Sequence, residues 1–252
     1  MEKVGFTTGC LFKSSIPFNE RINWYNFFGA DAIELSFATP DELLSYELTP
    51  DIKKGLESFD CITVHAPWKQ MRYDSDTTTT KVLEKLKVLD EQIPISGMVV
   101  HPDTIYVHKR LENSKLPFLL ENMDKRKKRG IQPEEFEKWN KDYGFGYVLD
   151  LQHVYEHDPS MSLTNEFLDV MGDRLAHMHV SGENSEYIHV PVYLADNKQA
   201  IEKVLKLDFK VPKILEGILT GHIDLVAKNE LELVRSYDSC QNNRSSDKVM
   251  RI

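Results

Sequence analysis

The segment YVLDLQHVYEHD, residues 147–158, begins as an aliphatic run and then places Asp150 and His153 three residues apart. A run this apolar is typical of a buried strand. Burying an ionised carboxylate without a partner costs several kcal/mol or more, so a compensating group must lie nearby. From this segment alone, the carboxylate could be compensated in three ways: by a metal ion, by a neighbouring cation, or by solvent at the end of the strand.

Seven further segments share this apolar, β-rich character. In chain order the eight are VGFTTGC (4–10), DAIELSF (31–37), CITVHAP (61–67), GMVVHPD (97–103), PFLLENM (117–123), GYVLDLQH (146–153), LAHMHVSG (175–182) and PKILEGI (212–218). Between them, apolar residues recur every three or four positions, as amphipathic helices require. The clearest such helices are predicted over 79–92, 132–143, 197–208 and 224–237.

Strands that alternate with helices pair in parallel through crossover connections. Eight such units in 252 residues predict a single (β/α)8 TIM barrel, with its active site at the C-terminal mouth of the strands. The short interval between the fourth and fifth strands predicts a brief helix there. The barrel is expected to span residues 1–238, followed by a polar, flexible tail over 239–252.

Composition narrows the class of partner. The 40 acidic and 31 basic residues give a net charge of −9, which disfavours nucleic acid as a partner without excluding it. The one dense basic run, DKRKKRG (124–130), is expected to be a solvated loop or, alternatively, an anion-attracting rim. The chain has no apolar stretch long enough to span a membrane and no secretory signal, and its three cysteines lack metal-type spacing. We therefore expect a cytoplasmic protein that does not associate with membranes.

Nearly every strand segment carries an ionisable side chain close to its C-terminal end. These side chains are Glu34, His65, His101, Glu121, Asp150 with His153, His179 and Glu216. In a β/α barrel all these ends open at one mouth, so the residues should converge in one pocket. Carboxylates and imidazoles crowded together are unfavourable without a cation, and this ligand set suits zinc, manganese or a similar ion. The sequence thus predicts a divalent metal centre.

The other histidines are placed by their position relative to the strands. His177 lies on the same strand face as His179 and is expected one layer deeper, as a packed or supporting residue. His189, on the loop after the seventh strand, is expected to reach back to the mouth. The remaining histidines are expected on the surface or on helices; they are His108, His157 and His222.

The motifs resemble the xylose isomerase-like TIM-barrel superfamily, which includes sugar isomerases and epimerases and the endonuclease IV group, or AP endonuclease family 2. The resemblance extends from about Val4 to Tyr237, and the motifs that carry it occur in the superfamily's order and strand positions. They are VHAP, VHPD, LLENMD, LDLQHVY, HMHVSG and ILEG.

Resemblance to the isomerases and epimerases implies one divalent ion (zinc, manganese, cobalt or magnesium) held by Glu121, Asp150, His179 and Glu216. Glu121 and Glu216 would also be the catalytic pair, exchanging a proton with a sugar or sugar phosphate through a metal-stabilised enediolate. His153 would hold substrate oxygens. This function is the one that the sequence favours, with a small sugar-like molecule as partner and a homo-oligomer left open.

Resemblance to endonuclease IV implies instead a multinuclear zinc phosphoesterase, in which His65, His101, His153 and His189 become additional metal ligands. Tyr187 stands where that group has an aspartate, two residues before His189. The retained histidines favour this alternative, whereas Tyr187 and the acidic net charge oppose it. A barrel that binds a metal or ligand without catalysis is the third alternative. In each case Glu34 is an additional candidate for metal or substrate contact.

Overall fold

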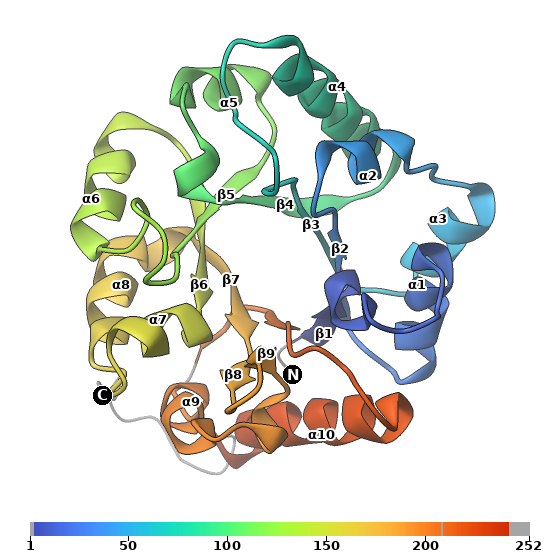
Figure 1. The fold of residues 1–252 in the computed structure, drawn as a ribbon, viewed down its shortest axis with the longest axis vertical. Coiled ribbons are helices and arrows are strands. Elements are labelled where there is room, and N and C mark those ends of the chain that lie inside the picture. Colours follow the sequence, from blue (N-terminus) through green and yellow to red (C-terminus); the bar gives the residue numbers. More distant parts are fainter. Residues whose placement is uncertain (1–2, 208, 242–252) are drawn as a thin grey trace.

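The computed structural model describes residues 3–207 and 209–241, and eight of its strands pair in parallel to close a barrel (Figure 1). In chain order these strands are β1 (Val4–Thr7), β2 (Ala32–Ser36), β3 (Cys61–His65), β4 (Ile95–Val100), β5 (Phe118–Glu121), β6 (Gly146–Asp150), β7 (Leu175–Val180) and β10 (Lys213–Leu215). Each lies within or overlaps one predicted segment. The predicted (β/α)8 TIM barrel is therefore confirmed.

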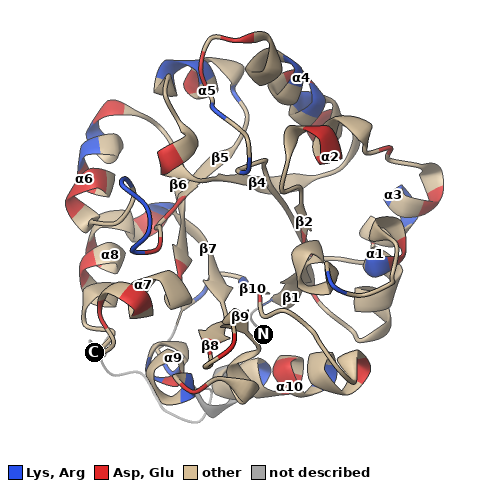
Figure 2. Ribbon diagram, in the orientation of Figure 1, with Lys and Arg blue, Asp and Glu red and all other residues tan. Residues whose placement is uncertain are grey.

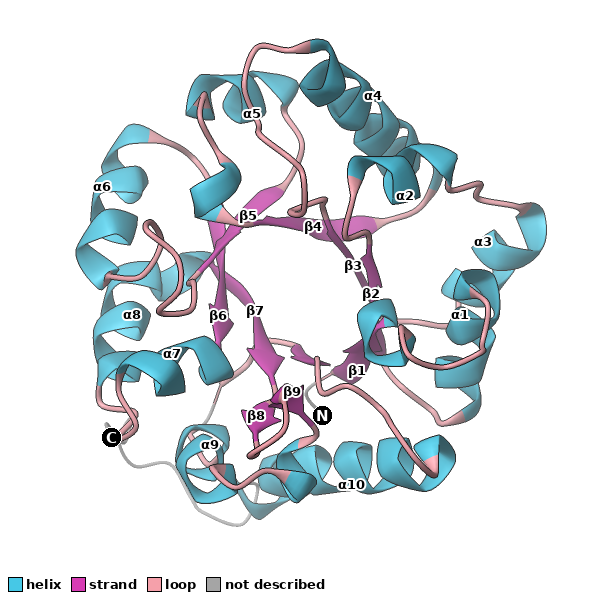
Figure 3. Cartoon of the chain, viewed as in Figure 1, coloured by secondary structure: helices cyan, strands magenta, loops and turns pink. Residues whose placement is uncertain are grey.

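Helices surround the strands (Figure 3). They are α1 (Phe18–Phe27), α2 (Pro40–Ser45), α3 (Pro50–Leu56), α4 (Thr77–Gln92), α5 (His108–Ser114), α6 (Pro133–Asp142), α7 (Leu151–His157), α8 (Leu163–Met171), α9 (Lys198–Leu205) and α10 (Ile223–Gln241). Short 3-10 turns add η1 (Thr8–Leu11), η2 (Pro102–Thr104), η3 (Gly172–Arg174) and η4 (Val192–Leu194). The four predicted helices are present, and α5 between β4 and β5 is brief, as expected.

Helix starts follow local chemistry. The Asp76 side chain accepts a hydrogen bond from the Thr79 amide and caps α4. Pro133 opens α6, where the Glu135 carboxylate accepts the amide hydrogens of Ile131 and Gln132. At the other end of the chain, α10 continues to Gln241, inside the segment predicted to be a tail, and residues 242–252 lie outside the described residues.

The barrel strands pack apolar side chains on both faces: a large core between strands and helices, and small clusters inside the barrel. Successive side chains of a strand point to opposite faces, so Ile33 and Leu35 pack in the large core beneath the helices, whereas Glu34 faces the barrel interior. Inside the barrel lie two small apolar clusters, Ala32–Cys61–Ile214 and Val99–Leu119–Val148. The polar residues of the strand ends lie above this apolar floor, at the mouth.

Two connections differ from the predictions. The predicted strand 146–153 ends at Asp150, and α7 begins at the next residue, because the Asp150 carboxylate accepts the His153 amide hydrogen as a helix cap. His153 is therefore helical. The segment after β7, expected to be a loop, forms a short antiparallel hairpin of β8 (Gly182–Glu183) and β9 (Ile188–Val190), which contains His189.

Within the described residues, every helix is too short or too polar to cross a membrane.

Candidate metal centre

The structure brings four of the predicted ligands together at the C-terminal mouth. We call them the first group: Glu121, Asp150, His179 and Glu216, whose ligand atoms all lie within 4.8 Å of one another. His179 Nδ1 lies 3.0 Å from Glu121 Oε1 and 3.4 Å from Glu216 Oε1. Each residue comes from a different strand or strand end, so only the closed barrel can assemble the group.

A second group shares one member with the first. His65 and His101, at the ends of β3 and β4, place their Nε2 atoms 3.2 Å apart. Both atoms face Glu121 Oε2, at 3.4 Å from His65 and 3.2 Å from His101. Trp68 packs its ring against both imidazoles. Glu121 thus presents Oε1 to the first group and Oε2 to the second group, which consists of His65, His101 and Glu121.

A lower group lies deeper in the barrel and consists of Glu34, His177 and His179. Glu34 was expected at the mouth, but it lies in the middle of β2, below the strand ends, and its side chain is completely buried. Its Oε2 lies 3.3 Å from His179 Nε2 and 3.5 Å from His177 Nε2. His177 occupies the deeper layer that its strand position predicted.

His153 and His189 lie side by side at the mouth, with ring centroids 5.3 Å apart. His189 has a left-handed backbone (φ 63°), which is uncommon for a residue other than glycine, and its Nδ1 lies 2.9 Å from Ser181 Oγ. Tyr187 does not join this pair, because its side chain is exposed and stacks beneath Lys13. Carboxylate oxygens lie 3.7 Å from His153 Nδ1 and 3.9 Å from His189 Nδ1, but among the described residues neither histidine belongs to a group of close donors that could hold a third ion.

The end of β10 holds the hairpin in place. The Ile218 amide donates to the His189 carbonyl, 2.9 Å away. A Cβ atom added to Gly217 would lie 2.3 Å from the backbone nitrogen of Pro191, so only glycine allows this approach. The contact brings His189 Nδ1 within 3.9 Å of Glu216 Oε2.

Asn122 is a site residue that the sequence reasoning missed. Its side chain donates to the Asp150 carbonyl and accepts from the Asp150 amide, at 2.9 and 2.6 Å. Its own carbonyl lies 2.8 Å from His153 Nδ1. The motif LLENMD carried the signal, since an asparagine directly after a strand-end ligand is positioned to bond the neighbouring strand.

The buried carboxylates and histidines of the pocket shift one another's pKa. Burial raises the pKa of Glu216 well above its usual range, and the Glu121 and Asp150 carboxylates add to this against the opposing effect of His179. Burial favours a high pKa for Glu121 too, but the surrounding histidines hold it well below its usual range. Burial lowers the pKa of His101, and that of His189 to about 4. Burial alone would lower the pKa of His179 and His153, but the neighbouring carboxylates raise both.

A divalent ion fits this donor set. Glu121 Oε2 and Asp150 Oδ2 are buried and, among the described residues, form no hydrogen bond of normal geometry, although His65 and His101 Nε2 lie 3.4 and 3.2 Å from Glu121 Oε2. Buried polar atoms are normally paired, so both atoms call for a ligand of another kind. Carboxylate and imidazole donors are those that zinc and similar ions prefer.

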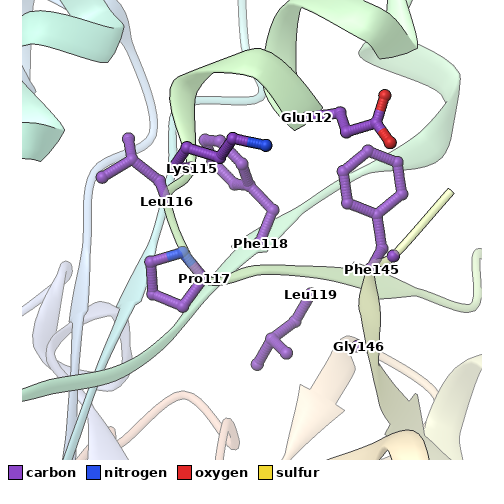
Figure 4. A pocket seen from close by; sticks show the side chains of 9 residues that line it. Glu112, Lys115, Leu116, Pro117, Phe118, Leu119, Phe145 and Gly146 are labelled. Carbon is purple, nitrogen blue, oxygen red and sulfur yellow. The ribbon is translucent and has the colours of Figure 1, made fainter.

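Two other surface features lie outside this pocket. A hollow between α5 and the N-terminal ends of β5 and β6 lies at the opposite end of the barrel and is largely apolar, with Leu116, Pro117 and Phe145 in its wall (Figure 4). The basic segment Lys125–Arg129 forms a loop after β5, as predicted, and lies beside the ring of strands near β6 (Figure 2). Within it, Arg126 pairs with Asp124 and Lys127 with Asp103.

Comparison with known proteins shows the fold. No family model matches the sequence, and no curated protein matches it. Among solved structures, endonuclease IV from Thermus thermophilus aligns with a TM-score of 0.69 and 16% identity, covering 94% of this chain and 99% of that one. A D-tagatose 3-epimerase-like protein aligns at 0.65 and 18%, covering 97% and 100%. The TTHB071 protein of Thermus thermophilus, soaked with zinc chloride, aligns at 0.59 and 15%, covering 96% and 100%. The chain therefore has the barrel fold on which both enzyme classes are built.

Proposed function

We propose that this chain is a metal-dependent phosphoester hydrolase with two divalent ions that share Glu121. One observation carries the proposal: the two oxygens of Glu121 face two separate sets of buried donors. Oε1 faces His179, whereas Oε2 faces His65 and His101. A carboxylate that bridges two ions uses its oxygens in this way.

Divalent ions held by these residues would supply the Lewis acidity that phosphoester hydrolysis needs. The chain's own groups have separate tasks. Glu216 has a side chain that is 16% exposed, whereas those of Glu121 and Asp150 are 2% and 0% exposed. Glu216 is therefore the carboxylate that can hold or transfer a proton at the substrate. Trp68 and His189, at the edges of the pocket, are positioned to limit the access of water.

The basic loop supports an anionic substrate. Lys125 and Lys128 are exposed in a loop that starts from the end of β5, directly after Glu121. They place positive charge beside the mouth of a protein whose net charge is −9. Local cations of this kind attract phosphate groups whatever the sign of the whole protein. The fold shared with endonuclease IV, together with the resemblance of His65 and His101 to histidines of that group, supports the same assignment.

Sugar isomerisation or epimerisation, which the sequence alone favours, is the second candidate. It is supported by the fact that, among the described residues, neither His153 nor His189 belongs to a donor group that could hold a further ion. It is also supported by the same fold in an epimerase-like protein. It would need only one ion in the first group. However, it requires Glu121 and Glu216 to reach the substrate from two sides, and Glu121 is enclosed by four histidines. That enclosure is why we rank it second.

The test is an assay panel on protein loaded with zinc or manganese. The panel contains an abasic-site duplex, a bis-aryl phosphodiester, and a set of ketoses incubated in deuterium oxide. We expect phosphodiester cleavage that Glu121→Gln reduces by about 1000-fold or more, because the bridging charge is lost. Glu137→Gln, an exposed glutamate on α6, is the matched control and should cleave normally. Deuterium incorporation into a ketose without phosphodiester cleavage would overturn the proposal and favour the isomerase.

A further inference from the structure

The His179 ring lies between two carboxylate environments. Its Nδ1 faces Glu121 and Glu216 of the first group, at 3.0 and 3.4 Å. Its Nε2 faces away from the mouth, 3.3 Å from Glu34 Oε2 and 3.2 Å from His177 Nε2. The ring is completely buried, so water cannot exchange partners with either nitrogen.

Only one of these nitrogens can bind an ion of the first group. A neutral imidazole carries one proton, and the nitrogen that ligates a metal must be the unprotonated one. Nδ1 therefore becomes a ligand only when the proton resides on Nε2. An imidazole free in water exchanges between the two forms, so the protein must select one of them.

Glu34 has the position and the chemistry to make this selection. It is completely buried, and its Oε2 already accepts the Thr63 hydroxyl hydrogen at 2.9 Å. A buried carboxylate is stabilised by N–H and O–H donors and destabilised by lone pairs. The closest ring nitrogens are His179 Nε2 and His177 Nε2. Each is therefore most stable as a donor to this oxygen, and the 3.2 Å contact between the two Nε2 atoms is then not a hydrogen bond.

We propose that Glu34 is a positioning residue that holds the proton on Nε2 of His179 and so leaves Nδ1 free to bind the ion of the first group. Glu34 itself contacts neither ion nor substrate. His177 is the second donor and keeps Glu34 Oε2 in place. The inference rests on the metal centre of the proposed function but not on the reaction that the centre performs.

Two measurements test this role directly. The first is nitrogen-15 NMR of histidine-labelled, zinc-loaded wild-type protein, with the His179 signals assigned by comparison with His179→Gln. It should show a proton on Nε2 and none on Nδ1. The second is zinc affinity by competition with a chromophoric chelator, for Glu34→Ala, Glu34→Gln and the control Glu230→Gln. Glu230 is also a buried carboxylate, but it binds the amides of Val192 and Tyr193.

Loss of a residue that hydrogen-bonds a metal-ligating histidine typically weakens metal affinity by about 10–100-fold, and we expect a loss of this size for Glu34→Ala. Glu34→Gln keeps an acceptor oxygen and should recover most of the affinity, while Glu230→Gln should bind as wild type does. A proton on Nδ1, or wild-type affinity in Glu34→Ala, would overturn the inference. So would the loss of a whole ion in Glu34→Ala, because the lower group would then hold an ion itself. If wild-type protein binds no zinc, it is the proposed metal centre that fails.

The NMR measurement needs no variant of Glu34, so it decides the question even if Glu34→Ala does not fold.

Discussion

Asn122 joins the ends of β5 and β6, which carry two of the four residues of the first group. Its side-chain amide donates to the backbone carbonyl of Asp150 and accepts from the backbone amide of Asp150. The backbone carbonyl of Asn122 faces His153 Nδ1. Because Asn122 is almost completely buried, replacing it would leave backbone groups without partners. The distance between Glu121 and Asp150 therefore depends on this residue.

We predict that Asn122→Ala lowers the free energy of unfolding by about 2 kcal/mol, since two buried hydrogen bonds are lost and their partners are left unpaired. Urea titration monitored by circular dichroism measures the change. Asn113→Ala, at an exposed position on α5, is the control and should change stability by less than about 0.5 kcal/mol. Equal stabilities for the two variants would show that Asn122 does not hold the strand ends together.

For single residues, the sequence predicts which ones converge at the mouth, but it does not predict which of their atoms face each other. The placement of Glu121, Asp150, His179 and Glu216 follows from strand ends, because all ends of a closed barrel open at one mouth. The side-chain depth of Glu34 does not, since an error of two residues in the strand end moves a side chain by a whole layer. The sequence likewise does not show that the two oxygens of Glu121 face different groups of donors, which requires coordinates.

At the scale of elements, helix α10 holds η4 against the barrel through one buried carboxylate. Glu230 accepts hydrogen bonds from the amides of Val192 and Tyr193, at 2.7 and 3.1 Å. Burial raises the pKa of Glu230 to about 7, although both hydrogen bonds and Lys198 act to lower it. η4 follows directly on β9, so this contact fixes α10 to the segment that leads into α9.

A raised pKa in the folded state stabilises the protein below the pKa of the unfolded chain, and this contribution is lost as the pH rises through the folded value. Between about pH 5 and about pH 8, we predict that wild-type protein loses about 2 kcal/mol of stability relative to Glu230→Gln. Denaturant titrations of both proteins over this range give the difference. If the free energies of unfolding of wild type and Glu230→Gln differed by the same amount at every pH in this range, Glu230 would not titrate there.

Element types could be predicted from periodicity, but two connections could not. The boundary between β6 and α7 falls inside one apolar run, where the Asp150 cap ends the strand and starts the helix. The β8–β9 hairpin leaves no alternating pattern, because its strands are only two and three residues long. His189 owes its place to the contact with Gly217, which is distant from it in the sequence.

At the scale of the whole molecule, charge is distributed unevenly. The chain has a net charge of −9, yet the basic loop after β5 lies beside the mouth (Figure 2). Net charge alone disfavours a polyanionic substrate, whereas the local charge favours an anionic group in the pocket. The barrel itself could be predicted because eight alternating units leave few other ways to bury their apolar faces. The reaction could not, since one fold supports several chemistries that differ in a few side chains.

The local charge predicts a substrate effect. Replacing Lys125 and Lys128 together by glutamine should raise KM for an anionic phosphoester by about tenfold at low salt, with kcat nearly unchanged, because exposed cations act mainly on the encounter. The difference from wild type should shrink as salt is added. Steady-state kinetics at two ionic strengths measure it. A KM that is unaffected at low salt would exclude this loop from substrate attraction.

The central claim is that Glu121 is shared by two metal ions, and the zinc content of His101→Ala tests it most directly. His101 belongs only to the second group, so its loss should leave the first group intact. Plasma mass spectrometry of zinc-loaded, gel-filtered protein should find about two zinc ions per chain in wild type and about one in His101→Ala. One ion in both proteins would contradict the account, because His65 and His101 would then not be ligands.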